Sequence, residues 1–157
     1  MLRAALHANP EEAVGGMAMG NAKTVEHFLG TSLHDGPIVG LSLAVRKPIV
    51  ATAGAADKSV RVWNFKDYSL DILKVFPEEP VGVTLHPGGF QIAVGFADKV
   101  KLMNIVTSEL RALRDIVIKG SRELKFSHGG HLLACVNNSS IHVYKTYTGE
   151  LHVGRRG

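Results

Sequence analysis

Cysteine, long apolar runs and concentrated charge are all scarce in this chain of 157 residues. The single cysteine, Cys135, excludes an internal disulfide and a zinc site built from several cysteines. No apolar run approaches the roughly 20 residues that a membrane-spanning helix needs. The net charge is only +4, and the basic residues are spread along the chain, so no nucleic-acid partner and no membrane partner are indicated. The sequence therefore predicts a soluble globular protein.

The chain changes character after residue 22. Residues 1–22 are rich in Ala, Gly and Met and carry no legible targeting signal, so we expect a poorly ordered leader. From residue 23 onward, short runs of Val, Ile, Leu and Thr alternate with Gly, Pro, Asp and Asn, without sustained helical periodicity. This pattern predicts an all-β domain over 23–157, with strands near 23–29, 38–44, 48–53, 59–64, 70–76, 80–86, 90–95, 100–105, 110–118, 120–126, 132–136 and 140–146.

An internal repeat runs through this β-rich part. The segment Val-Arg-Val-Trp at 60–63 recurs in related form at 100–103 and at 141–144, with spacings of 40 and 41 residues. The segment at 56–58 returns at 97–99, and the segment at 86–89 returns at 127–130, both after 41 residues. Four short strands in each period of about 40 residues are typical of a propeller blade. We expect three units, at about 34–76, 80–118 and 120–157.

The first unit resembles the WD-repeat family. The segment His-Asp-Gly-Pro-Ile-Val at 34–39 stands where that family has its Gly-His segment, and Asp-Lys-Ser-Val-Arg-Val-Trp-Asn at 57–64 matches its turn and third strand. The resemblance implies a buried structural tetrad of His34, Thr52, Asp57 and Trp63. Polar groups that bond to one another in this way avoid the cost of unsatisfied burial.

The second and third units depart from the family pattern. The second keeps Asp98 but has Met103 in place of Trp, and the third has Tyr144 and no clear turn Asp. Their tetrads cannot form, so apolar burial between blades must hold them. Strand alternation predicts that Arg61 and Lys101 reach solvent and that six neighbours are buried: Val60, Val62, Val100, Leu102, Ile141 and Val143.

Closed propellers have about four to eight blades, and this chain supplies three units and a leading strand at 23–29. We therefore expect an incomplete WD-repeat propeller that is not a closed ring. Open blade faces invite pairing. The remaining propeller blades, in cis or in trans, are the expected partners of these faces.

A narrower resemblance covers about residues 34–147 and is most particular in residues 80–144. The segments 86–90, 94–99, 101–104 and 126–132 resemble the WD-repeat region of the cilia- and flagella-associated protein 57 family, and Leu-Met-Asn at 102–104 is the most discriminating part. That family implies a non-catalytic scaffold of the ciliary or flagellar axoneme, which helps to position inner-arm dyneins and regulatory complexes on doublet microtubules. The alternative is a generic WD-repeat interaction module, such as a ubiquitin-ligase substrate receptor or a signalling scaffold. Long heptad repeats in the flanking sequence would favour the axonemal scaffold.

Three basic or ionisable residues, Arg61, Lys101 and His142, occupy one equivalent position in the three units. This position is either a solvated strand position or a shallow basic band that faces an acidic partner. The pair His128 and His131 has no accompanying ligands, and no Cys/His or Gly-x-Ser-x-Gly arrangement is present. We therefore expect no metal, no cofactor and no enzymatic activity.

Overall fold

The computed structural model describes residues 3–6, 25–28 and 33–156. Within these ranges every strand pairs antiparallel with its neighbours and no helix occurs. The chain divides into two units, Met1–Leu33 and His34–Gly157.

The first unit contains a two-stranded sheet. Strand β1 (Arg3–Leu6) pairs with β2 (Val25–Phe28), and Arg3 lies opposite Phe28. The strand expected near 23–29 is therefore present as β2, but its partner β1 comes from the segment expected to be a leader. Residues 1–2 and 7–22 of that segment lie outside the described residues.

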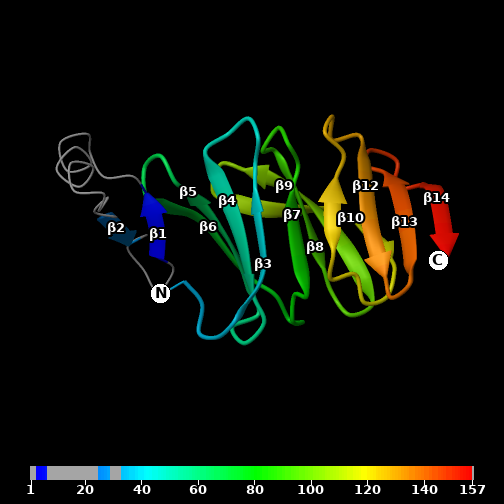
Figure 1. The fold of residues 1–157 in the computed structure, drawn as a ribbon, viewed down its shortest axis with the longest axis horizontal. Helices are drawn as coiled ribbons and strands as arrows, with labels where there is room; N and C mark the ends of the chain where they lie inside the picture. Colours follow the sequence, from blue (N-terminus) through cyan, green and yellow to red (C-terminus); the bar gives the residue numbers. More distant parts are fainter. Residues whose placement is uncertain (1–2, 7–24, 29–32, 157) are drawn as a thin grey trace, which may run out of the picture. The chain divides into compact units, whose positions relative to one another are not determined.

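The second unit consists of three four-stranded sheets, each formed by strands that are consecutive in the chain. We call these sheets blades 1, 2 and 3, and Figure 1 shows them side by side in chain order. The strands of blade 1 are β3 (Ile38–Leu43), β4 (Ile49–Gly54), β5 (Ser59–Asn64) and β6 (Ser69–Val75). Those of blade 2 are β7 (Gly82–Leu85), β8 (Gln91–Gly95), β9 (Lys99–Val106) and β10 (Glu109–Val117). Those of blade 3 are β11 (Leu124–Phe126), β12 (Leu132–Asn137), β13 (Ser140–Lys145) and β14 (Leu151–Arg156).

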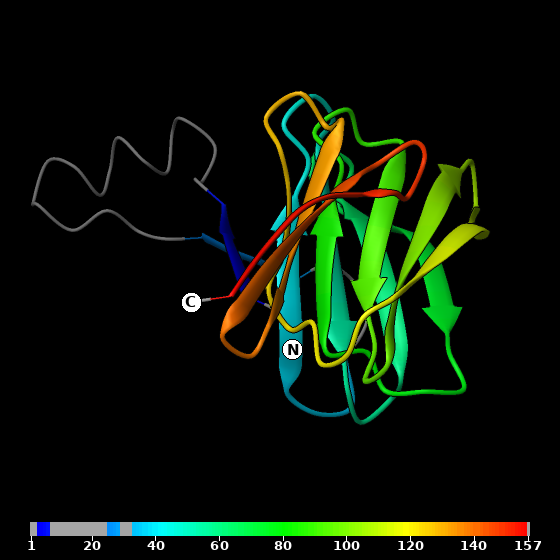
Figure 2. The ribbon, with the colours of Figure 1, turned by 90° about the vertical axis from the view of Figure 1, so that its right-hand side faces the viewer.

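The blades pack face to face through two apolar clusters. One cluster joins blade 1 to blade 2 and contains Val60 and Ile92. The other joins blade 2 to blade 3 and contains Val100 and Leu133. Because side chains alternate between the two faces of a strand, each blade offers one apolar face to each neighbour. Figure 2, which looks along this stack from the side of β14, shows the sheets one behind another.

The predicted burial of the third strands is confirmed in blades 1 and 2 and is wrong in blade 3. Val60 and Val100 have no exposed surface, and Val62 and Leu102 are also buried. Ile141, at the equivalent position of blade 3, is 53% exposed. Its face of β13 has no further blade against it among the described residues. Three blades are fewer than a closed ring requires, so the expected all-β, incomplete propeller is confirmed.

Candidate functional site

The four residues of the predicted tetrad come from four places in blade 1. His34 precedes β3, Thr52 lies on β4, Asp57 lies in the turn between β4 and β5, and Trp63 lies on β5. In the β4–β5 ladder, Thr52 is paired with Arg61 and Trp63 with Val50, so the two tetrad side chains project from the face opposite Val60. The structure brings all four side chains together.

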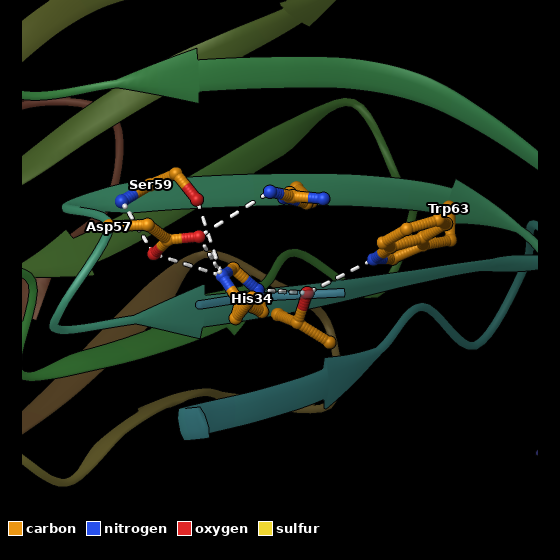
Figure 3. Close-up of polar contacts among 6 residues, drawn as sticks. His34, Asp57, Ser59 and Trp63 are labelled. Atoms are coloured by element: carbon orange, nitrogen blue, oxygen red, sulfur yellow. Dashed lines mark hydrogen bonds and ion pairs between the residues drawn. The ribbon is translucent and has the colours of Figure 1, made fainter. Parts of the chain in front are cut away.

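A continuous chain of hydrogen bonds links them (Figure 3). The indole N–H of Trp63 donates to Thr52 Oγ1 at 3.0 Å, and Thr52 Oγ1 lies 2.9 Å from His34 Nε2. His34 Nδ1 lies 2.8 Å from Asp57 Oδ2. Since a carboxylate only accepts, Nδ1 carries the proton, and Nε2 accepts from the Thr52 hydroxyl. This direction along the chain satisfies both ring nitrogens and the threonine oxygen.

Asp57 is the acidic end of this network. Burial by itself would raise the pKa of Asp57, but hydrogen bonds from Ser59 and His34, together with the charge interaction with His34, lower it below its ordinary value. The Ser59 N–H lies 3.4 Å from Asp57 Oδ1, and the Arg61 guanidinium lies 3.4 Å from Oδ2. The carboxylate is therefore held in its ionised form by groups of its own blade.

The sequence did not predict two residues of this site. Ser59 adds its hydroxyl 3.2 Å from His34 Nδ1. A side chain at Gly54 would overlap His34 Nδ1 and Asp57 Oδ1, so only glycine leaves room for the imidazole there. The sequence could have indicated both residues only through their position beside the turn that carries Asp57. Gly54 ends β4 before this turn, and Ser59 begins β5 after it.

The three equivalent basic positions are engaged within their own blades. The Arg61 side chain is only 13% exposed and pairs with Asp57, so the prediction that it reaches solvent is wrong. Lys101 is 26% exposed and lies 3.5 Å from Asp115. The ring of His142 stacks beside that of Tyr144, with centroids 6.4 Å apart. These contacts weaken the interpretation of a free basic band, which stays a prediction.

The part of the chain that the structure describes holds one cysteine, and it is buried. Burial raises the pKa of Cys135 to about 12, which keeps its sulfur in the unreactive thiol form. In the same residues, no group of three or more His, Cys, Asp or Glu side chains is placed to hold a metal ion. None of the described segments forms a helix long and apolar enough to cross a membrane.

Comparison with curated proteins finds relatives among the cilia- and flagella-associated proteins. Cilia- and flagella-associated protein 57 of Mus musculus is 42% identical over 130 residues, which are 83% of this chain and 10% of the relative. The 57 A protein of Tetrahymena thermophila is 44% identical over 117 residues, 74% of this chain and 9% of the relative. The chain thus spans about a tenth of the length of these relatives. Their names support the ciliary or flagellar location expected from the sequence. No family model matches the chain.

Comparison with solved structures supports the fold. The Cps50 (Swd1) β-propeller domain of Myceliophteria_thermophila matches with a TM-score of 0.66 at 17% identity, over 76% of this chain and 42% of that one. Hydrazine synthase of Kuenenia stuttgartiensis matches with a TM-score of 0.64 at 16% identity, over 76% of this chain and 37% of that one. Both levels of resemblance predicted from the sequence, to WD-repeat propellers and to cilia- and flagella-associated protein 57, are therefore confirmed.

Proposed function

We propose that this chain, a WD-repeat propeller segment homologous to part of cilia- and flagella-associated protein 57, works as a non-catalytic scaffold in the axoneme of cilia or flagella. In this role it helps to position inner-arm dyneins and regulatory complexes on doublet microtubules. The observation that carries the proposal is the identity above 40% to relatives of that name in both a mammal and a ciliate.

The geometry supports a binding role rather than a chemical one. The tetrad is a network of buried polar side chains. Its donors and acceptors bond to one another inside blade 1. A network that is satisfied internally holds a scaffold rigid, and the loops on a rigid scaffold are the usual place for recognition.

The test is the location of the tagged chain in a ciliated cell. Cilia are isolated and treated with detergent, which releases the membrane and the soluble matrix and leaves the axoneme. We expect the chain to stay with the axoneme. The matched control is Val100→Asp, which buries a charge at a position with no exposed surface and should abolish folding and retention together.

Two results would contradict the proposal. Release of the wild-type chain with the matrix would argue against an axonemal scaffold. Equal retention of the wild type and of Val100→Asp would show that the folded propeller is not what binds.

A further inference from the structure

An inner groove of about 710 Å3 runs along the first strands of the three blades, β3, β7 and β11. Two of its lining side chains on the blade 1 side are strongly exposed for apolar residues: Leu43 is 59% exposed and Val45 is 71% exposed. On the blade 3 side the groove is lined by exposed polar residues with one acidic and two basic side chains: Arg122, Glu123, Lys125 and His128. Contiguous exposed apolar surface beside polar groups marks an interaction site.

One end of this groove is formed by three equivalent turns. We call them the turn rim: residues 44–48, 86–90 and 127–131, which connect the first and second strands of each blade. Each turn is closed by a backbone hydrogen bond from its first residue to the residue that follows its last. The N–H of Ala44 donates to the Ile49 carbonyl at 3.1 Å, that of His86 to the Gln91 carbonyl, and that of Ser127 to the Leu132 carbonyl. The turn rim is therefore a repeated, regular structure.

The turns are also locked to one another across the blades. The N–H groups of Val45 and Arg46 both donate to the Pro87 carbonyl, at 3.1 and 3.0 Å. The Lys47 side chain packs on Gly89, and the His86 ring packs against Gly130. A surface held in this way is ordered before a partner arrives, which lowers the entropic cost of binding.

The turn rim carries positive charge and no Asp or Glu. Arg46 and Lys47 are both exposed on the turn rim, and Lys125, on β11, lines the groove. Burial lowers the pKa of His86, and repulsion from Arg46 lowers it further, although a backbone hydrogen bond with Gly130 acts in the opposite direction. The positive charge of the turn rim therefore comes from the side chains of Arg46 and Lys47.

Each acidic residue of the neighbouring turns has a basic residue beside it. Asp67, Glu109 and Glu150 lie at the same ends of blades 1, 2 and 3, because the turn after the third strand returns to the end of the turn after the first. Glu109 pairs with Arg111 at 2.8 Å and Glu150 with Lys145 at 3.4 Å. Asp67 follows the exposed Lys66 in the chain, and its carboxylate accepts from the Asn64 side-chain amide at 2.9 Å.

We infer that the inner groove and the turn rim bind an extended acidic segment of another protein. Its apolar side chains lie against Leu43 and Val45, and its carboxylates lie against Arg46, Lys47 and Lys125. Charge complementarity selects an acidic partner, and the apolar lining selects protein over nucleic acid, whose binding depends on many phosphate contacts with Lys and Arg. This inference concerns binding chemistry and does not depend on the ciliary location.

Fluorescence anisotropy with labelled peptides tests the inference on the 157-residue chain. The probe is a peptide of about ten alternating Glu and Leu residues, and the comparison peptide has Gln in place of Glu. We expect the Glu peptide to bind at least about tenfold more tightly, with an affinity that falls as NaCl screens the charges. Equal binding of the two peptides would overturn the inference. Stronger binding of a single-stranded oligonucleotide of similar length would also overturn it, in favour of a nucleic-acid surface.

Two matched double variants locate the site. The variant Arg46→Glu with Lys47→Glu should weaken binding of the Glu peptide at least about tenfold, because it reverses the charge of the turn rim. The control, Lys58→Glu with Lys119→Glu, makes the same change in net charge at exposed positions on the opposite ends of the blades. It should change the affinity less than about twofold. An equal loss in both variants would show that net charge alone attracts the peptide and that the turn rim is not a site.

Discussion

The hydrogen bond between Trp63 and Thr52 allows a direct test of the tetrad. Thr52→Val keeps the shape of the side chain and removes the oxygen that accepts from the indole N–H at 3.0 Å and lies 2.9 Å from His34 Nε2. Thr52 and Trp63 have no exposed surface, so water cannot replace the lost partner. Each of the two abandoned groups costs about 1 to 3 kcal/mol, so the free energy of unfolding should fall by about 2 to 6 kcal/mol.

A double-mutant cycle with Trp63→Phe separates this bond from ordinary packing. Trp63→Phe loses ring volume but also removes the indole N–H, so the double variant leaves one unsatisfied group fewer than the two single variants together. We expect the double variant to lose about 1 to 3 kcal/mol less than the sum of the singles. Urea unfolding followed by far-UV circular dichroism measures all four proteins, and Thr107→Val at an exposed position is the control. Additivity within about 0.5 kcal/mol, or a Thr52→Val loss no larger than that of the control, would refute the reasoning.

Two further predictions concern blade 3. Gly130→Ala should destabilise the protein by more than about 3 kcal/mol, because the new methyl group overlaps the His86 ring and φ is +80°. Gly120→Ala, where φ is +62° and nothing lies within 4 Å, should cost only about 1 kcal/mol in the same denaturation assay, and equal losses would contradict the clash. Cys135, with a pKa raised to about 12, should react with iodoacetamide at pH 8 only after denaturant is added. Rapid labelling of the native chain would show that β12 is not packed as described.

The repeat predicted the blades because it is a local signal that occurs three times. The Val-Arg-Val-Trp segment and its two relatives fall on β5, β9 and β13, and each predicted unit contains one four-stranded sheet. Strand β1 had no such signal. Its residues Arg-Ala-Ala-Leu include no β-branched or aromatic side chain, and it pairs with a strand about twenty residues away.

Burial on the outer blade faces was harder to predict than strand position. Ile141 has the same local pattern as Val60 and Val100, yet it is exposed, because burial depends on a neighbouring blade and not on the strand itself. The contact of Arg61 with Asp57 depends in the same way on how far the β4–β5 turn folds back. The alternation of residues along a single strand therefore predicts neither the exposure of Ile141 nor the contact of Arg61 with Asp57.

The ladder register explains why the tetrad is confined to blade 1. Thr52 pairs with Arg61 nine positions later, whereas Val94 pairs with Lys101 and Cys135 with His142 only seven positions later. The longer β4–β5 connection lets Asp57 reach His34, while Asp98, in the shorter connection of blade 2, is 66% exposed and lies 3.4 Å from Lys99.

The same register shows what replaces the lost bonds. Val94 stands in blade 2 where Thr52 stands in blade 1, and Met103 stands where Trp63 stands. Acceptor and donor are thus both absent, and two buried apolar side chains take their place. Removing one partner of a buried hydrogen bond leaves an unsatisfied group, whereas replacing both with apolar groups is nearly neutral. Blade 2 therefore lacks the network without the penalty expected for Thr52→Val. The two apolar side chains that replace it belong to the cluster that blade 2 shares with blade 1.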